Sequence, residues 1–168
     1  MTMLREDPTL LNSVEAGGFG AMHFAAFNGD LDLLRLLLSH HADVNLVNYD
    51  DNTPLVMAVK GHQLEAITML LEAGAEVNMA STSSGATAAH HAAAMGYVDC
   101  LRLLVKAGAT VHFDALDAGS LLHWACHSGQ VDCVGAMLYE FNVDVNTVDS
   151  HGGTALLTAL FMEKLAVV

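Results

Sequence analysis

The feature that most constrains how this 168-residue chain can fold is an internal repeat. The segment GAMHFAA at 20–26 reappears as TPLVMAV at 53–59, TAAHHAA at 87–93, SLLHWAC at 120–126 and TALLTAL at 154–160. Segments that recur at intervals of about 33 residues are typical of proteins built from stacked units. No single copy could bury its own apolar residues, so we expect the copies to pack against one another.

Each copy has a second, leucine-rich half that recurs in step with the first. This half reads LRLLLSHHADVN at 34–45, ITMLLEAGAEVN at 67–78 and LRLLVKAGATVH at 101–112, and a fourth copy at 134–146 carries one extra residue near Asn142. Thr53 is suited to cap a helix, and Pro54 suits the first helical position. Gly74 and Gly108 stand where a helix would end in a left-handed residue. The pattern predicts two helices joined by a turn in every copy.

These motifs resemble the ankyrin repeat, whose pattern combines TPLHxAA, GH and LLLxxGADVN. The resemblance extends over residues 15–168, and its most literal matches are Thr53-Pro54-Leu55, Gly74-Ala75, Asp43-Val44-Asn45, His23, His90 and His123. It implies an all-α solenoid of β-turns and antiparallel helix pairs, with four full repeats and a partial fifth. We place an N-terminal extension or partial cap at 1–14, repeats at 15–47, 48–81, 82–114 and 115–148, and an apparently truncated repeat at 149–168.

The charge and apolar content of the chain narrow the classes of partner. The sequence is 53% hydrophobic and carries a formal net charge of −13, so phosphate backbones and anionic lipid surfaces should repel it. It has neither an apolar run of about 18 residues nor a basic segment followed by an apolar one. We expect an intracellular, cytoplasmic chain that binds neither nucleic acid nor membrane, either as a monomer or as part of a larger chain.

Ten histidines raise the question of a metal site. The resemblance implies structural hydrogen bonds near the turns for His23, His90 and His123. His127 would share a helix face with His123, as zinc ligands can, but Cys126 should point inward and no second ligand pair has zinc-site spacing. We predict no metal ion and no cofactor. A metal-binding solenoid on the His127–His151 side stays as an alternative.

The sequence indicates neither redox nor hydrolytic chemistry. Its three cysteines lack a CxxC spacing, and stacking would hold Cys100 and Cys133 about 10 Å apart, beyond disulfide reach. We interpret them as small buried hydrophobic residues. The sequence contains no GxSxG, no phosphate-binding glycine loop and no HExxH. We therefore predict that this chain is not an enzyme.

The surface that stacking leaves free is the candidate for function. In the family that the chain resembles, partners bind the turn tips and the exposed side of the inner helices, which form a concave groove. Carried over by position, the predicted partner-binding residues are Phe19, Phe27, Asn28, Tyr49, Asp50, Asn52, Lys60, Ser83, Ser84, Met95, Leu116, Asp117, His127, Ser128, His151, Phe161 and Met162. Tyr49 and Met95 favour binding most strongly. Phe27 and Phe161 fit equally well an interpretation in which they cover the ends of a short stack.

Two irregularities interrupt the repeat. The second copy has Gly61-His62 where the others place glycine one residue later, which predicts a distorted turn or a longer helix. One extra residue near Ser81–Ser84 and another near Asn142 should lengthen loops, which are frequent places for specific contacts.

The main functional hypothesis is a non-catalytic scaffold that binds another protein through its concave surface. Because the chain is acidic, we expect a basic or amphipathic partner segment. A second hypothesis is a regulatory or substrate-recruiting segment of a larger enzyme, channel or ubiquitin ligase. Leu165, Val167 and Val168 would begin an outer helix that stops within its first turns, so we expect a truncated chain, an incompletely assigned gene or a fragment of a longer protein.

Overall fold

The computed structural model describes residues 12–111 and 119–162. Within these residues the chain forms four helix pairs followed by a single helix. Apart from the isolated β-bridges Val14–Gly20 and Val148–Thr154, the described part has no extended pairing. The helices are α1 (Ala21–Asn28), α2 (Leu31–Ser39), α3 (Pro54–Lys60), α4 (Leu64–Glu72), α5 (Ala88–Met95), α6 (Val98–Lys106), α7 (Leu121–Ser128), α8 (Val131–Tyr139) and α9 (Ala155–Phe161). The predicted all-α repeat fold is confirmed.

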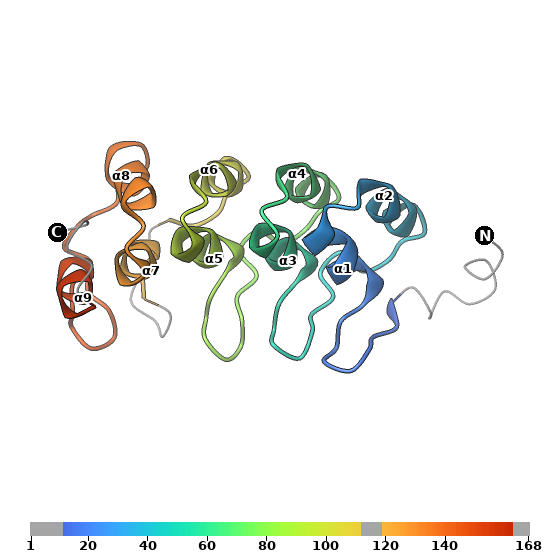
Figure 1. Ribbon diagram of the computed structural model, residues 1–168, viewed down its shortest axis with the longest axis horizontal. Helices are drawn as coiled ribbons and strands as arrows, with labels where there is room; N and C mark the ends of the chain where they lie inside the picture. The colour runs from blue at the N-terminus through green and yellow to red at the C-terminus, as the bar shows by residue number, and fades with distance from the viewer. Residues whose placement is uncertain (1–11, 112–118, 163–168) are drawn as a thin grey trace.

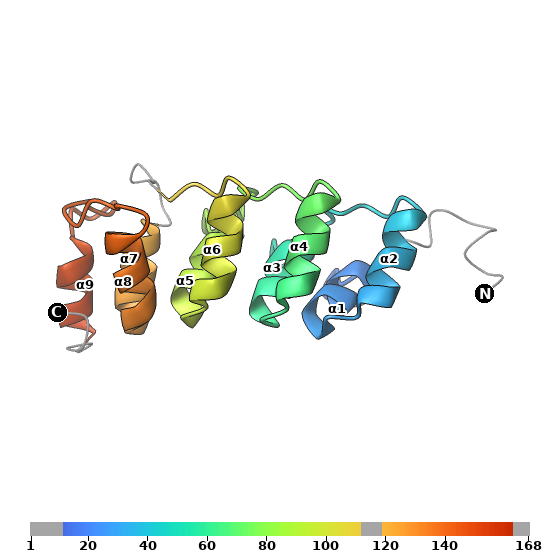
Figure 2. The same cartoon turned by 90° about the horizontal axis from the view of Figure 1, so that it is seen from above.

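The helices form two layers that run the length of the molecule (Figures 1 and 2). The odd-numbered helices contact one another in sequence, from α1 through α9, and make the inner layer. The even-numbered helices, α2 to α8, contact one another likewise and make the outer layer. The loops from α2 to α3, from α4 to α5 and from α8 to α9 project below the inner layer in Figure 1, and we call them fingers.

The inner helices start and stop at residues that suit these roles. The Thr53 hydroxyl accepts a hydrogen bond from the Val56 amide at 3.2 Å, and Pro54 follows at the first helical position. In the last unit Thr154 caps α9 in the same way, through the amide of Leu157. The short helices are therefore defined by their caps as well as by their packing.

The core is one continuous cluster that the two layers share. The inner helices contribute alanines that are fully buried, among them Ala26, Ala58 and Ala92. Such small side chains allow neighbouring inner helices to approach closely. The outer helices contribute larger side chains, and their fully buried members include Leu34, Ile67, Leu70, Leu101, Leu104 and Met137. No unit completes this core alone, as the sequence predicts.

Buried histidines join consecutive units. The ring nitrogen Nδ1 of His90 accepts a hydrogen bond from the Thr87 amide at 3.1 Å, so Nε2 carries the proton and donates to the Gly119 carbonyl of the next unit at 3.2 Å. His23 makes the equivalent bonds to Gly20 and Asn52, each at 3.0 Å. This geometry gives the histidines the structural part that the family resemblance implies.

His123 repeats the same arrangement at the last interface. Its Nδ1 lies 2.7 Å from the Ser120 hydroxyl, and its Nε2 donates to the Gly153 carbonyl at 3.0 Å. We refer to His23, His90 and His123 as the bridging histidines.

The turn between α3 and α4 is neither distorted nor preceded by a longer helix, contrary to our expectation. Gly61 adopts a right-handed conformation with φ −81°, and His62 takes the left-handed position with φ 55°. The Gln63 amide then donates to the Ala58 carbonyl at 2.9 Å, as Asp30 does to Ala25 in the first unit. Histidine tolerates the left-handed region better than most residues, so the turn keeps its shape.

Gly61 is required by a close approach between the first two units. A Cβ atom at this position would lie 2.0 Å from the Phe27 carbonyl oxygen, which belongs to the backbone and cannot rotate away. We predict that Gly61→Ala lowers the free energy of unfolding by about 3 kcal/mol, measured by urea denaturation. Gly135→Ala in α8 is the control, because a Cβ there meets nothing within 4 Å. It should stabilise by roughly 0.5–1 kcal/mol, and equal losses in both variants would contradict the clash.

Because the two histidines of α5 are held neutral by burial, we predict that the protein loses stability in acid. Burial lowers the pKa of His90 to about 4, and burial together with the charges of Lys60 and His90 lowers the pKa of His91 to about 4. In the unfolded chain both titrate near 6.5. Between these pH values the unfolded state binds more protons, so stability is full above about pH 6.5 and declines toward pH 4.

His91→Gln isolates part of this effect, because glutamine is polar but does not titrate. The free energy of unfolding of this variant, measured by urea denaturation from pH 7 down to about pH 4, should fall less steeply than that of the wild type. His40→Gln, at an exposed position after α2, serves as the matched control. The same decline in the wild type and in His91→Gln would show that His91 is not held neutral.

Candidate partner-binding surface

The fingers and the exposed sides of the inner helices form one face of the molecule, which we call the groove face. Most of the residues predicted to bind a partner are exposed or half-buried on it. The exposed ones are Phe27, Asn28, Tyr49, Asp50, Ser83, Ser84, Met95, His127, His151, Phe161 and Met162. The half-buried ones are Phe19, Lys60 and Ser128. Leu116 and Asp117 lie outside the described residues.

Asn52 differs from the rest of the predicted set, because it is buried at 7% exposure. Its carbonyl accepts the bond from His23, and its side-chain oxygen accepts a hydrogen bond from the Lys60 ammonium at 2.9 Å. Asn52 therefore holds the stack together and positions Lys60, and we no longer include it in the exposed surface.

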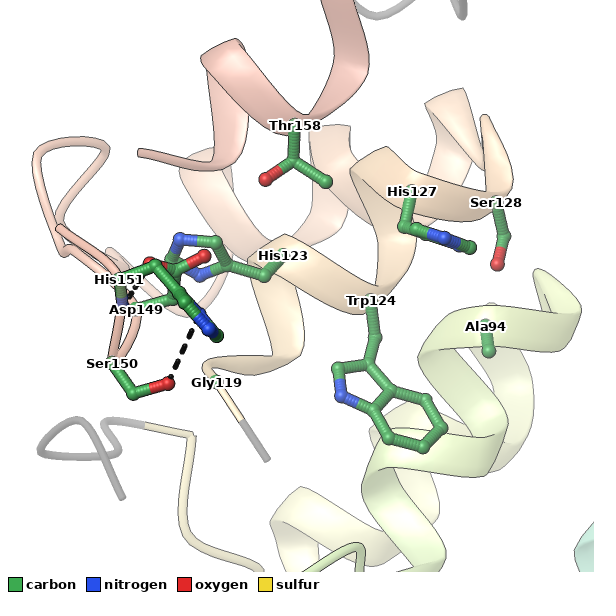
Figure 3. Close-up of a pocket in the computed structure, with 10 residues that line it drawn as sticks. All are labelled: Ala94, Gly119, His123, Trp124, His127, Ser128, Asp149, Ser150, His151 and Thr158. Atoms are coloured by element: carbon green, nitrogen blue, oxygen red, sulfur yellow. Dashed lines mark hydrogen bonds between the residues drawn. The ribbon is translucent and has the colours of Figure 1, made fainter. Parts of the chain in front are cut away.

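A hollow of about 420 Å³ opens on the groove face between the third and fifth units (Figure 3). Inner helices α5, α7 and α9 provide its walls, and the finger before α9 closes one side. It brings together the predicted residues His127, Ser128 and His151. Its other lining residues are Ala94, Gly119, His123, Trp124, Asp149, Ser150 and Thr158.

Trp124 is the hollow's largest side chain and was not among the predicted residues. Its ring meets His90 edge-on at 5.3 Å and His91 at 5.8 Å between centroids, which ties the wall of α7 to α5. Trp124 follows His123 directly, and His127 and Ser128 are three and four positions later on the same helix face. The position of the single tryptophan three and four residues before His127 and Ser128 was the sequence signal that could have predicted the hollow.

The finger that carries His151 is held by Asp149. Its carboxylate accepts hydrogen bonds from the amides of Gly153 and His151 at 2.8 and 2.9 Å. These bonds, the Gly153 bond foremost, lower the pKa of the Asp149 carboxyl, so it stays ionised and fixes the loop. The Ser150 hydroxyl lies 3.3 Å from the His151 ring (Figure 3). His151 is thus presented from an ordered loop.

Another finger is organised by Asp51. One carboxylate oxygen accepts hydrogen bonds from the Thr82 hydroxyl at 2.7 Å, the Ser83 amide at 3.2 Å and the Ser81 hydroxyl at 3.3 Å. These bonds, led by Thr82, lower the pKa of Asp51. The segment with the extra residue near Ser81–Ser84 is therefore fastened to the preceding finger, and its exposed serines face outward from a fixed loop.

The aromatic side chains at the first units differ in what holds them. Phe19 packs on His23 and Phe24, with centroid distances of 5.9 and 5.6 Å, and so contributes to local structure. Tyr49 donates its backbone amide to the Gly17 carbonyl at 3.0 Å, yet its side chain is 77% exposed. Phe27 is 43% exposed. Tyr49 is thus an aromatic side chain on a fixed backbone that the stack does not bury.

The cysteines do not offer a nucleophile. Burial raises the pKa of Cys100 to about 12 and of Cys133 to about 11, and it also raises the pKa of Cys126. All three are therefore protonated near neutral pH, whereas reactive cysteines are thiolates in partly exposed, electropositive sites.

Every helix of the described part is too short to cross a lipid bilayer.

Comparison with known proteins agrees with this architecture. A family model for ankyrin repeats in three copies matches residues 6–81 and 22–115, and a second model for ankyrin repeats in many copies matches residues 122–168. The "Probable E3 ubiquitin-protein ligase XBOS33" of Oryza sativa subsp. japonica is 41% identical over 104 residues, covering 61% of this chain and 20% of the relative.

Two further relatives show the same kind of partial match. The E3 ubiquitin-protein ligase XBAT33 of Arabidopsis thaliana is 30% identical over 178 residues, covering 89% of this chain and 34% of the relative. The human ankyrin repeat and SOCS box protein 16 is 36% identical over 110 residues, covering 66% of this chain and 24% of the relative. The chain spans about a third or less of these proteins. On its repeat motifs, its helix pairs and both family models, the chain belongs to the ankyrin-repeat family.

Proposed function

We propose that this chain is a non-catalytic protein-interaction module that binds its partner on the groove face. The observation that carries the proposal is the exposure of aromatic and Met side chains on this face, on a backbone that the stack already holds. Tyr49 is 77% exposed, Phe27 43% and Met95 39%, and none of the three is needed to complete the core. Preorganised aromatic and Met side chains are the usual anchors of protein interfaces.

The hollow beside Trp124 supports the same proposal. It is concave, lined by an indole ring and by the imidazoles of His127 and His151, and large enough to receive one side chain of a partner. Its walls belong to helices and to a finger fixed by Asp149, so little order is lost when the partner binds. We propose that the partner inserts an apolar or aromatic side chain here.

The charge of the chain favours a basic or amphipathic partner segment. The formal net charge is −13, and Asp50 is exposed beside Tyr49 on its finger. Opposite charge accelerates encounter and makes it sensitive to salt, while the apolar contacts set the lifetime of the complex. Association should therefore slow as the ionic strength rises.

A second candidate function is substrate recruitment for a larger ubiquitin ligase. Its support is that XBOS33 and XBAT33 are named as ubiquitin-protein ligases, and that the matched region makes up only 20% and 34% of them. Under this proposal the groove face holds the protein to be modified and a domain elsewhere in a longer chain performs the transfer. Ubiquitylation of a captured partner by the full-length protein, lost when Tyr49 is changed, would distinguish it from simple scaffolding.

Site-specific photo-crosslinking tests the groove face. A photoreactive phenylalanine analogue replaces Tyr49 or Met95 and, as the matched control, Tyr139, which is 89% exposed on outer helix α8. In an extract of the cells that express the protein, we expect the same adduct from positions 49 and 95 and none from position 139. An adduct formed only at position 139 would place the partner on the outer layer and overturn the proposal.

Alanine variants then give the strength of the contact. Tyr49→Ala and Met95→Ala should each weaken binding of the crosslinked partner about tenfold, because each removes an exposed anchor without opening the core. Tyr139→Ala should leave the affinity unchanged. Circular dichroism and urea unfolding should be the same for all three variants and the wild type, which separates loss of contact from loss of fold.

A further inference from the structure

One position in the repeat carries a residue that the fold alone does not explain. The turn from inner to outer helix has a left-handed residue in each full unit, and three units use glycine there, Gly29, Gly96 and Gly129, with φ between 70° and 79°. The second unit uses His62, with φ 55°. A side chain in this conformation costs about 1 kcal/mol or more relative to glycine. The contacts that the imidazole makes act against that cost.

The imidazole of His62 faces the third unit and is held there on two sides. Its ring stacks on Tyr97 with centroids 4.0 Å apart and planes 10° from parallel. Its Nε2 lies 2.9 and 3.0 Å from the two carboxylate oxygens of Asp99. Opposite Gly29 and Gly96 the residue equivalent to Tyr97 is a glutamine, Gln63 and Gln130 respectively, whose side chain lies over the glycine. The histidine and the tyrosine therefore occur together.

Cys100 lies beside His62 and Asp99 and is the third potential metal ligand of the cluster. It is fully buried at the start of α6, and its amide donates a hydrogen bond to an Asp99 carboxylate oxygen at 2.8 Å. The ligand atoms of His62, Asp99 and Cys100 all lie within 4.8 Å of one another. In the part of the chain that the structure describes, no other group of three potential metal ligands is this close.

We propose that His62, Asp99 and Cys100 form a binding site for a divalent transition-metal ion of the zinc class. One nitrogen, one oxygen and one sulfur donor suit zinc, which accepts imidazole, carboxylate and thiolate in tetrahedral sites. Zinc bonds of about 2.0–2.3 Å place neighbouring ligand atoms roughly 3.5 Å apart. In this structure the three ligand atoms lie within 4.8 Å of one another, so the side chains must move closer together to share one ion. His62 is exposed, and under this proposal a water molecule supplies the fourth ligand.

Binding of one metal ion releases one proton from the site. The Cys100 thiol loses its proton to solvent and becomes the thiolate ligand, because a coordinating thiol is deprotonated by the ion. In the metal-free site the Nε2 of His62 carries the proton that faces the Asp99 carboxylate. On binding, that proton exchanges through solvent to Nδ1, so the neutral ring offers the Nε2 lone pair to the metal and only the thiol proton is released. The bound ion would then join the α3–α4 turn of one unit to α6 of the next, and this site is independent of the groove face.

The chain contains its own comparison for this site. Asp132 and Cys133 repeat the Asp99–Cys100 pair one unit later, but the facing residue there is Gly96, which supplies no imidazole. A metal that needed only an acidic residue beside a buried thiol would bind at both places. The proposal requires binding at the first pair alone.

Cobalt(II) is the probe, because a thiolate bound to cobalt gives a near-ultraviolet charge-transfer absorption that histidine or carboxylate ligands do not give. We expect this absorption in the wild type to saturate at one cobalt ion per chain. Added Zn²⁺ should abolish it. It should be lost in Cys100→Ala and retained in Cys133→Ala. In His62→Gly the apparent affinity should fall at least tenfold. Glycine is the residue that the other units carry here, so this variant is expected to fold.

The outcomes separate clearly. Absence of the absorption in the wild type, its survival in Cys100→Ala, or an unchanged affinity in His62→Gly would each overturn the proposal. Loss in Cys133→Ala with retention in Cys100→Ala would assign the thiolate to the other unit and would also overturn it. Zn²⁺ should in addition raise the melting temperature of the wild type and not that of folded His62→Gly.

Discussion

The hydrogen bond from a bridging histidine to the next unit is the interaction on which the rest of this structure depends. His90 closes its own helix start at Thr87 and donates its remaining proton to the Gly119 carbonyl of the following unit. The two bonds of this one side chain thus cap the start of a helix, fix the tautomer of the ring and set the register between neighbouring units. The cost of burying the imidazole is offset only while both bonds are made. Units that could not fold alone are joined in this way.

That arrangement separates the residues that build the stack from those that remain free. The core uses the alanines of the inner helices, the leucines of the outer helices and the bridging histidines. This core holds the backbone around Tyr49, Met95 and the hollow beside Trp124, but it does not bury these parts of the surface. The contact between His62 and Asp99 also joins two units, but it does so at the turn between inner and outer helix. It uses a histidine where the fold requires only a left-handed residue.

The sequence predicts the fold because each physical requirement recurs at the same interval. Thr53-Pro54 could be assigned without coordinates, because capping depends on local spacing, and the structural part of His90 was implied by the family resemblance. Asn52 could not, because its burial follows from where His23 of the previous unit reaches. The hollow was likewise missed: it arises where α5, α7, α9 and a finger converge, and its Trp124 wall depends on the offset between units. The turn at His62 was expected to be distorted, or its helix longer, because Gly61 comes one residue earlier than the glycine of the other units. The structure places His62 itself in the left-handed position.

Native-state hydrogen exchange on His90→Ala tests the central claim that a bridging histidine couples one unit to the next. Stability in such stacks is a sum of unit and nearest-neighbour terms. The account predicts faster exchange of the amides of α7 and α8, with α1 and α2 close to the wild type, and a broader urea transition as the two parts separate. Equal acceleration in every helix, with the transition as steep as in the wild type, would show that the bond contributes only global stability and would contradict the account.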